Sequence, residues 1–113
     1  MDESQCLKAA DILNAKDTKI ERVDLPELDG FVYVKTMTGI QKDAFDNSLL
    51  VTSGGKRDVV PLNARAKFLV HVVCDVDGNQ LFTEADVERL GQKSSAILER
   101  LWRAARRLAA AEE

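Results

Sequence analysis

Two hydrophobic periodicities alternate along this chain of 113 residues. In residues 20–25, Val23 and Leu25 fall on one face and charged side chains on the other. Residues 31–35 are largely β-branched and aromatic, and the turn-forming pair Asp29-Gly30 lies between the two segments. These features predict a β-hairpin, which needs a helix over one face because two strands alone are only marginally stable in water. Elsewhere apolar residues recur every three to four positions, the spacing of amphipathic helices. The pattern predicts an α+β fold, with an N-terminal β-hairpin packed on a small bundle of about four to five helices and a long C-terminal helix.

The helices are predicted from this spacing and from the residues at their ends. Residues 38–41 (Thr-Gly-Ile-Gln) have the capping-box arrangement, and residues 83–86 (Thr-Glu-Ala-Asp) form a second entry of this type. Gly91 is expected to stop the helix that follows, and Asp2 or Ser4 would cap the first one. The predicted helices cover residues 4–14, 39–51, 61–74, 84–91 and 94–108.

Three segments need separate comment. Residues 68–74 leave helix and strand open, because their β-branched run suits a strand while the length and lead-in of the segment favour a helix. Residues 52–60 begin with a small, polar stretch that contains paired glycines, which predicts a flexible loop too short to separate two domains. Residues 109–113 are expected to fray. We therefore expect a single domain over residues 1–113.

Composition and charge exclude several classes of protein. The chain carries 16 Lys and Arg against 19 Asp and Glu, a net charge of −3, which does not suggest a general nucleic-acid binder. Membrane association is not expected, since no apolar run approaches the ~20 residues that span a bilayer, and the acidic N-terminus is no signal peptide. Cys6 and Cys74 lie far apart, which predicts free thiols in a reducing cytosol.

The acidic segment 75–86 partly fits the template of a calcium-binding loop. Asp75, Asp77, Asn79, Thr83 and Asp86 fall at positions 1, 3, 5, 9 and 12 of that template. The match fails at position 6, which requires glycine, and at position 12, where a glutamate should bind through both oxygens. An Asp-Gly turn followed by a Thr-capped helix explains the segment better, so we expect no metal site here.

The remaining candidate chemistry is weak. Residues 53–56 (Ser-Gly-Gly-Lys) lack the spacing of a phosphate-binding loop. His71 and Cys74 would share a helix face, but two ligands do not make a zinc site, and a Cys-His dyad would need a thiol of lowered pKa. A buried histidine that donates one hydrogen bond is the simpler interpretation. We expect no catalytic residue, no metal and no cofactor.

The predicted C-terminal helix carries an apolar stripe and a basic face. The stripe consists of Leu98, Leu101, Trp102, Ala105 and Leu108. It fits the protein core and a partner-binding surface about equally well, since tryptophan beside arginine is typical of interface hot spots. The basic face (Arg100, Arg103, Arg106 and Arg107) offers an alternative function, a small DNA-associated regulator of the antitoxin or repressor type.

The order of these features resembles the phage tail assembly chaperone family of long-tailed phages and prophages. The resemblance is carried by residues 11–17 (Asp-Ile-Leu-Asn-Ala-Lys-Asp), the hairpin and Thr38-Gly39. It continues in residues 76–87, with Asp-Gly-Asn-Gln-Leu-Phe before a capping threonine, and in Leu-Gly-Gln-Lys-Ser at residues 90–94. It extends from about residue 11 to residue 108.

This resemblance implies a non-enzymatic role in building phage tails. Such chaperones bind the tape measure protein, a long helical rod, keep it soluble and help recruit tail tube subunits. They work in the host bacterial cytoplasm and are not expected in the mature virion. A small acidic domain can cover apolar helical faces with its own apolar stripe, or with the edge of the hairpin. Repeated weak contacts along a rod would favour self-association.

Overall fold

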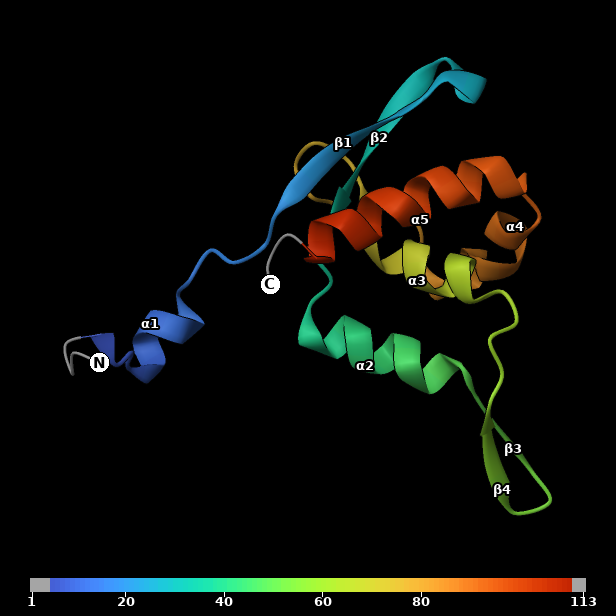
Figure 1. The fold of residues 1–113 in the computed structure, drawn as a ribbon, viewed down its shortest axis with the longest axis horizontal. Helices are drawn as coiled ribbons and strands as arrows, with labels where there is room; N and C mark the ends of the chain where they lie inside the picture. Colours follow the sequence, from blue (N-terminus) through green and yellow to red (C-terminus); the bar gives the residue numbers. More distant parts are fainter. Residues whose placement is uncertain (1–4, 111–113) are drawn as a thin grey trace.

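The computed structural model describes residues 5–110. Its centre is a three-stranded antiparallel sheet in the order β1-β2-β5. The strands are β1 (Ile20–Leu25), β2 (Gly30–Lys35) and β5 (Val73–Cys74). The helices around them, labelled in Figure 1, are α2 (Gly39–Ser48), α3 (Ala64–Val72), α4 (Val87–Gly91) and α5 (Ser95–Ala110). The predicted α+β class, with its N-terminal hairpin and long C-terminal helix, is confirmed.

The β1–β2 hairpin follows the predicted alternation. Val23 and Leu25 are buried, and the charged residues between and beside them face outward, because successive side chains of a strand point to opposite faces. The strands are joined through a 3₁₀ turn, Pro26–Leu28, after which Asp29 adopts a left-handed φ of 53°. Gly30 then begins β2. The hairpin prediction is confirmed, with an additional 3₁₀ turn at its tip.

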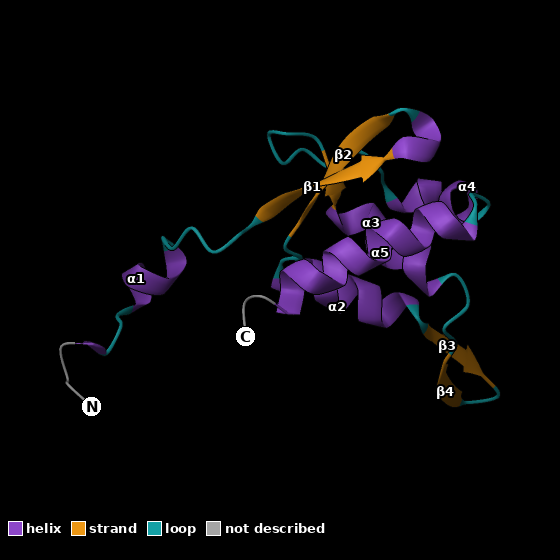
Figure 2. Ribbon diagram, turned by 45° about the horizontal axis from the view of Figure 1, so that its top comes forward, coloured by secondary structure: helices purple, strands orange, loops and turns teal. Residues whose placement is uncertain are grey.

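The hydrophobic core lies between the sheet, α3 and α5. Leu69 and Val70 of α3 and Val34 of β2 have no exposed surface. Helix α5 contacts β1, β2 and α3 and so covers one side of this core, an arrangement that can be followed in Figure 2. Burial of this apolar surface is the main favourable term in folding. The packing of α5 against the hairpin and α3 therefore contributes to the stability of the domain.

Both predicted helix entries are present. The Oγ1 atom of Thr38 accepts from Gln41 N at 3.2 Å, and Thr38 N donates to Gln41 Oε1 at 3.0 Å. Thr83 N donates to Asp86 Oδ2 at 2.9 Å, at the start of a 3₁₀ turn that leads into α4. Each bond satisfies a backbone donor that a helix start leaves unpaired.

Residues 52–60 do not form the flexible loop that we expected. They belong to a second hairpin, β3 (Leu50–Ser53) and β4 (Lys56–Val59), which projects from the helices in Figure 1. Gly54 and Gly55 form its turn with φ values of 58° and 79°. Two adjacent residues at positive φ suit the tight turns that match the twist of paired strands. The glycine pair therefore marks a hairpin turn and not a linker.

Several helix boundaries differ from the predicted ones. Helix α3 begins at Ala64, and not near residue 61, because Asn63 adopts a left-handed φ of 59°. It ends at Val72 and the chain continues as β5, so the segment 68–74 is helical as far as residue 72 and extended after it. Helix α2 ends at Ser48, before residue 51, since the next residues enter β3.

The N-terminal helix is shorter than predicted and stands apart from the core. Helix α1 covers only Ala9–Leu13, and every residue from 5 to 20 is exposed. Figures 1 and 2 both place α1 away from the other helices. The expected caps Asp2 and Ser4 lie outside the described residues. At the other end, residues 109 and 110 extend α5, while 111–113 also lie outside the described part.

Among residues 5–110, no helix has both the length and the apolar character that crossing a membrane requires.

Candidate protein-binding surface

The structure places most of the predicted partner-binding stripe in the core. Leu98, Leu101, Ala105 and Leu108 are buried, at 3–9% exposure, against the sheet and α3. Trp102 is half-buried. The sequence left core and partner surface open for the stripe, and in the isolated chain four of its residues are core. Only Trp102 presents part of its side chain to solvent.

Trp102 ends a row of three aromatic rings that links α2, α3 and α5. The rings of Phe45 and Phe68 lie 5.2 Å apart, and those of Phe68 and Trp102 lie 5.1 Å apart, both in edge-to-face geometry. Guanidinium groups of Arg65 and Arg106 lie 5.9 Å and 5.6 Å from the centre of the Trp102 ring. Cation–π contacts of this kind stabilise by about 0.5–1 kcal/mol at exposed sites. A tryptophan whose ring packs on another aromatic ring and lies close to arginine side chains has the composition of an interface hot spot.

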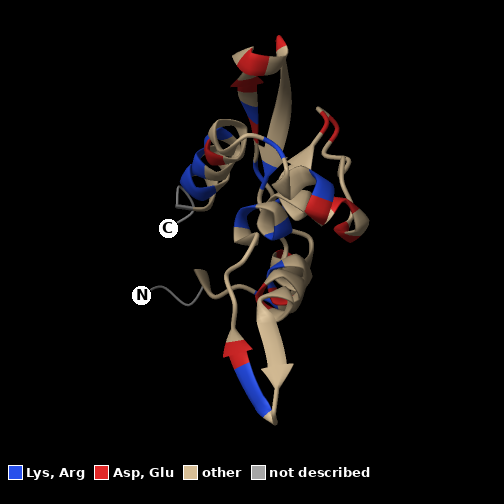
Figure 3. Cartoon of the chain, turned by 90° about the vertical axis from the view of Figure 1, so that its right-hand side faces the viewer, with Lys and Arg blue, Asp and Glu red and all other residues tan. Residues whose placement is uncertain are grey.

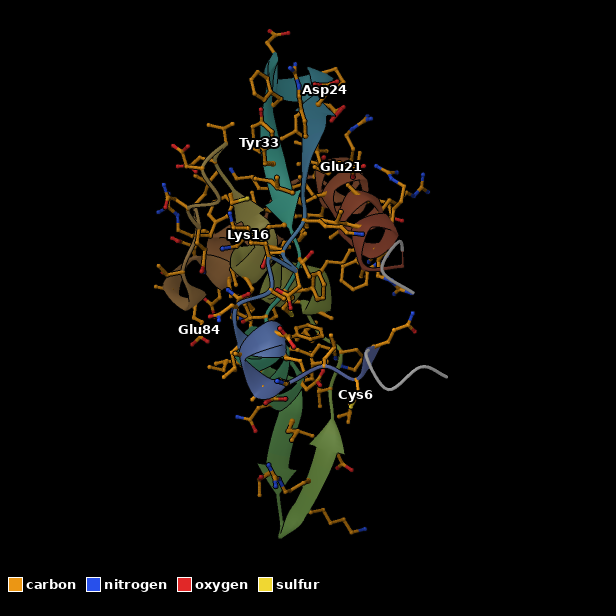
Figure 4. The ribbon with its side chains drawn as sticks, turned by 90° about the vertical axis from the view of Figure 1, so that its left-hand side faces the viewer. Cys6, Lys16, Glu21, Asp24, Tyr33 and Glu84 are labelled. Atoms are coloured by element: carbon orange, nitrogen blue, oxygen red, sulfur yellow. The ribbon has the colours of Figure 1, made fainter. Side chains whose placement is uncertain are left out.

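Ion pairs engage most of the basic face of α5, which is seen in Figure 3. Arg100 contacts Glu27 at 2.7 Å, and Arg107 contacts Glu21 at 2.9 Å. Glu21 projects from β1 towards α5 (Figure 4), so both pairs connect the helix to the hairpin. Arg103 pairs with Glu99 on α5 itself at 3.1 Å.

These pairs weaken the case for a DNA-binding face. DNA binding draws on unpaired cations that can neutralise phosphates, whereas the carboxylates of the hairpin and of α5 already lie beside three of the four arginines. Exposed pairs of this kind contribute only about 0–1 kcal/mol to stability. We therefore assign the Arg100 and Arg107 pairs to the docking of α5 on the hairpin.

The acidic segment after β5 forms the expected turn. The Oδ1 atom of Asp75 accepts the backbone N–H groups of Asp77 and Asn79, each at 2.9 Å, and its Oδ2 accepts from the side-chain amide of Asn79 at 3.2 Å. Gly78 adopts a φ of 84° within the turn. Within residues 5–110, no group of three or more His, Cys, Asp or Glu is arranged to hold a metal ion. The carboxylate of Asp75 thus organises the backbone of the turn.

We expect Asp75→Ala to destabilise the protein more at neutral pH than in acid. The N–H groups of Asn79, Asp77 and Gly78 lower the pKa of Asp75, the backbone bond from Asn79 contributing most. A carboxyl group whose pKa is lowered by folding stabilises above its unfolded pKa of about 3.9, and this contribution is lost as the pH falls through the folded value. Thermal melts at neutral pH and near pH 3 would measure the difference. An equal destabilisation at both pH values would contradict this assignment.

His71 and Cys74 do not share a helix face as expected. His71 is in α3, but Cys74 is in β5, paired with Tyr33 of β2. Both residues are buried. Burial raises the pKa of the Cys74 thiol, which Lys35 counteracts only in part. A thiol with a raised pKa is protonated at neutral pH, so the geometry gives no support to the Cys-His dyad.

The sequence patterns did not predict an apolar groove that opens between the hairpin tip, α4 and the first turns of α5. Its volume is about 610 Å³, and its apolar lining includes Leu28, Phe82 and Ile97. Arg89 and Lys93 supply cationic groups at its surface. The one signal in the sequence was Leu28, an apolar residue beside the Asp29-Gly30 turn, and the structure leaves it 63% exposed. The other residues come from distant segments, which only the fold brings together.

A half-buried tryptophan bordered by arginines and an open apolar groove on a small α+β fold are features of a protein-binding domain. The family model described as phage tail assembly chaperone matches residues 19–113. The chain therefore belongs to the phage tail assembly chaperone family, as its resemblance to that family indicated.

A solved structure has a similar fold. It is the tail assembly chaperone of bacteriophage HK97, with a TM-score of 0.64, covering 88% of this chain and 94% of that chain at 20% sequence identity. No curated protein matches the chain significantly. Because the identity is low, the likeness to the HK97 protein establishes the fold alone.

Proposed function

We propose that this protein is a non-enzymatic chaperone that binds the tape measure protein and helps recruit tail tube subunits during assembly of a phage tail. The observation that carries the proposal is the family match over residues 19–113. The chaperone would act in the host bacterial cytoplasm and be absent from the mature virion. A tape measure protein exposes long apolar helical faces before the tube encloses it, and a small domain of net charge −3 would keep the complex soluble.

We place the contact with the tape measure protein at Trp102 and the residues around it. Of the predicted stripe, Trp102 alone has substantial exposed surface. Its ring is held by Phe68, so little conformational freedom is lost when a partner covers it. Arg106 beside the ring can pair with acidic residues that flank an apolar helical face, whereas Arg65 already contacts Glu99 at 3.0 Å.

Affinity capture tests the proposal directly. The protein would carry an N-terminal tag and be expressed with its native neighbouring genes, and the captured proteins would be identified by mass spectrometry after nuclease treatment. Recovery of a long helical protein together with a tube-forming subunit supports the chaperone function. Isolation of the chain alone, with DNA retained when nuclease is omitted, supports the regulator instead.

We expect Trp102→Ala to weaken binding of the tape measure protein about tenfold, or 1.4 kcal/mol. The loss follows from removing an exposed ring that is anchored at a helix surface. Binding would be measured by titration of the purified partner.

Leu108→Ala is the matched control, because Leu108 is on the same helix but is only 9% exposed. It should lower the melting temperature and leave the affinity unchanged. If Trp102→Ala lowered only the melting temperature, the contact would not lie at Trp102.

A further inference from the structure

The second hairpin, formed by β3 and β4, is exposed to solvent on both of its faces. Every residue of β4 is exposed, and in β3 only Leu50 is partly buried. Figures 1 and 2 show the hairpin projecting from the end of α2 away from the other elements. Two strands alone are only marginally stable in water and need a further strand or a covering helix. The hairpin therefore has the form of a sheet that a partner completes.

The register of the hairpin shows which of its backbone groups point outward. Ser53 and Lys56 flank the tight turn, so they form a hydrogen-bonded pair. Hydrogen-bonded and non-hydrogen-bonded pairs alternate along an antiparallel ladder, and the bond of 2.6 Å from Val60 N to Leu49 O agrees with this alternation. The non-hydrogen-bonded pairs, whose N–H and C=O groups point away from the hairpin, are Thr52–Arg57 and Leu50–Val59.

The outer edge of β4 therefore presents the N–H and C=O groups of Arg57 and Val59 to solvent. Among residues 5–110, no backbone group bonds to them. A row of free donors and acceptors along a strand is a template for the addition of another strand. An α-helix cannot take this place, because its N–H and C=O groups are bonded within the helix. The edge thus fits an extended segment and not the helical protein proposed to contact Trp102.

Charge distinguishes the two edges of this hairpin. Strand β4 carries Lys56, Arg57 and Asp58, whereas β3 has no charged residue, a difference seen at the bottom of Figure 3. Neither Lys56 nor Arg57 has an ion-pair partner in the part of the chain that the structure describes. Opposite charges on facing strands stabilise a sheet, and like charges destabilise it. The β4 edge therefore favours a strand with acidic residues opposite its two cations.

A second copy of the chain fits this edge poorly. When two β4 strands pair antiparallel, the outward groups of Arg57 and Val59 must face each other or their own counterparts. Pairing Arg57 with Val59 places two Asp58 side chains opposite each other, and centring the pair on Arg57 places two arginines together. Centring it on Val59 brings Pro61, which has no N–H, opposite Arg57. Strand β3 of a second copy offers no carboxylate. The occupant expected here is a strand from a different protein.

We propose that the β4 edge binds an extended acidic segment of a partner protein, which adds to the hairpin as a third, antiparallel strand. Backbone hydrogen bonds to Arg57 and Val59 supply affinity, and Lys56 and Arg57 select acidic side chains. Val59, which is 66% exposed, packs against an apolar side chain of the added strand. The contact uses none of the residues around Trp102, so it goes beyond the function proposed above.

A strand peptide titrated into the purified full-length chain tests this proposal. The probe is a capped peptide with the central order valine, threonine, glutamate, glutamate, which places its acidic residues opposite Arg57 and Lys56 when it runs antiparallel to β4. A peptide with lysine in place of both glutamates should bind roughly tenfold more weakly. Hydrogen exchange followed by NMR should show protection of the amides of Arg57 and Val59 by the acidic peptide, and none at Leu50 and Thr52.

Two proline variants separate strand addition from unspecific binding. Val59→Pro removes an outward N–H of the β4 edge without removing a hydrogen bond of the hairpin, and proline is tolerated on edge strands. It should abolish binding of the acidic peptide. Thr52→Pro is the matched control, because it removes an outward N–H from the β3 edge, and it should bind like the wild type. NMR spectra of both variants should retain the cross-strand contacts of the hairpin.

A charge-reversal variant tests the selection of acidic segments. Lys56→Glu with Arg57→Glu should bind the lysine peptide in preference to the acidic one. The proposal is overturned if the acidic peptide does not bind the wild-type chain, if it protects the β3 edge, or if Val59→Pro binds it as tightly as Thr52→Pro does. These measurements use the purified chain and a peptide, so their outcome does not depend on binding of a tape measure protein.

Discussion

Replacing Leu69 with alanine should lower the free energy of unfolding by about 3 kcal/mol. Leu69 has no exposed surface and belongs to the core cluster that joins α3 to the sheet and to α5. Truncation removes apolar contacts and leaves a cavity, because the surrounding helix and strands relax only in part. In a domain of this size the expected decrease in melting temperature is roughly 12 °C. Chemical and thermal denaturation followed by circular dichroism would measure both quantities.

Leu62→Ala provides the matched control for this prediction. Leu62 precedes α3 by two residues and is 76% exposed. The same chemical change there should alter the free energy of unfolding by no more than about 0.5 kcal/mol. If Leu69→Ala changed the free energy of unfolding as little as Leu62→Ala does, burial of Leu69 between α3, the sheet and α5 would contribute little to stability.

The elements that the sequence predicted well are those whose signals are local. The hairpin has alternating residues and a turn pair within one short segment, and each capping box needs residues only three positions apart. The long helix has a stripe that is repeated over several turns. Such patterns act within a few residues, so tertiary packing reinforces them and has little reason to override them.

The errors arose where the same local signal suits two structures. Paired glycines are found in flexible linkers and in hairpin turns, and the strands around Gly54-Gly55 are short and exposed. At the start of α3, Pro61 is compatible with the first turn of a helix. The left-handed conformation of Asn63 nevertheless delays the helix to Ala64. The competing backbone conformation of a single residue decided the outcome.

The candidate site was predictable only in part, because it depends on which helix face is covered. Periodicity placed Trp102 and Leu108 in one stripe, but it could not tell which of them packs inward. In the structure the hairpin and α3 cover the stripe and leave part of Trp102 at its edge. The groove depends entirely on long-range packing, since its lining includes residues as distant as Leu28 and Ile97.

The second large effect concerns Gly91, which was expected to end α4 as a helix-stop residue. Helix α4 does end there, but Gly91 has no positive φ. It lies instead directly against the side chain of Asn63, and a Cβ atom at residue 91 would overlap this side chain, coming within 2.6 Å of its Nδ2 atom. The Leu-Gly-Gln-Lys-Ser segment thus has its glycine where α4 approaches the start of α3.

Gly91→Ala should therefore lower the free energy of unfolding by about 2 kcal/mol. The Asn63 side chain cannot simply move away, because its Nδ2 donates to the backbone oxygen of Val87 at 3.2 Å. The new methyl group either breaks that bond or pushes α4 away from α3. Denaturation of the single variant would measure the cost.

A double-mutant cycle with Asn63→Gly identifies the cause of this cost. Glycine is compatible with the left-handed backbone at residue 63 and removes the side chain that Gly91→Ala meets. In that background Gly91→Ala should cost nothing, or stabilise by about 0.5 kcal/mol, since alanine is the better helix former. The coupling energy between the two sites should then be about 2 kcal/mol. Additive effects would instead show that alanine at residue 91 acts on α4 alone, and that the contact with Asn63 does not set the spacing between α3 and α4.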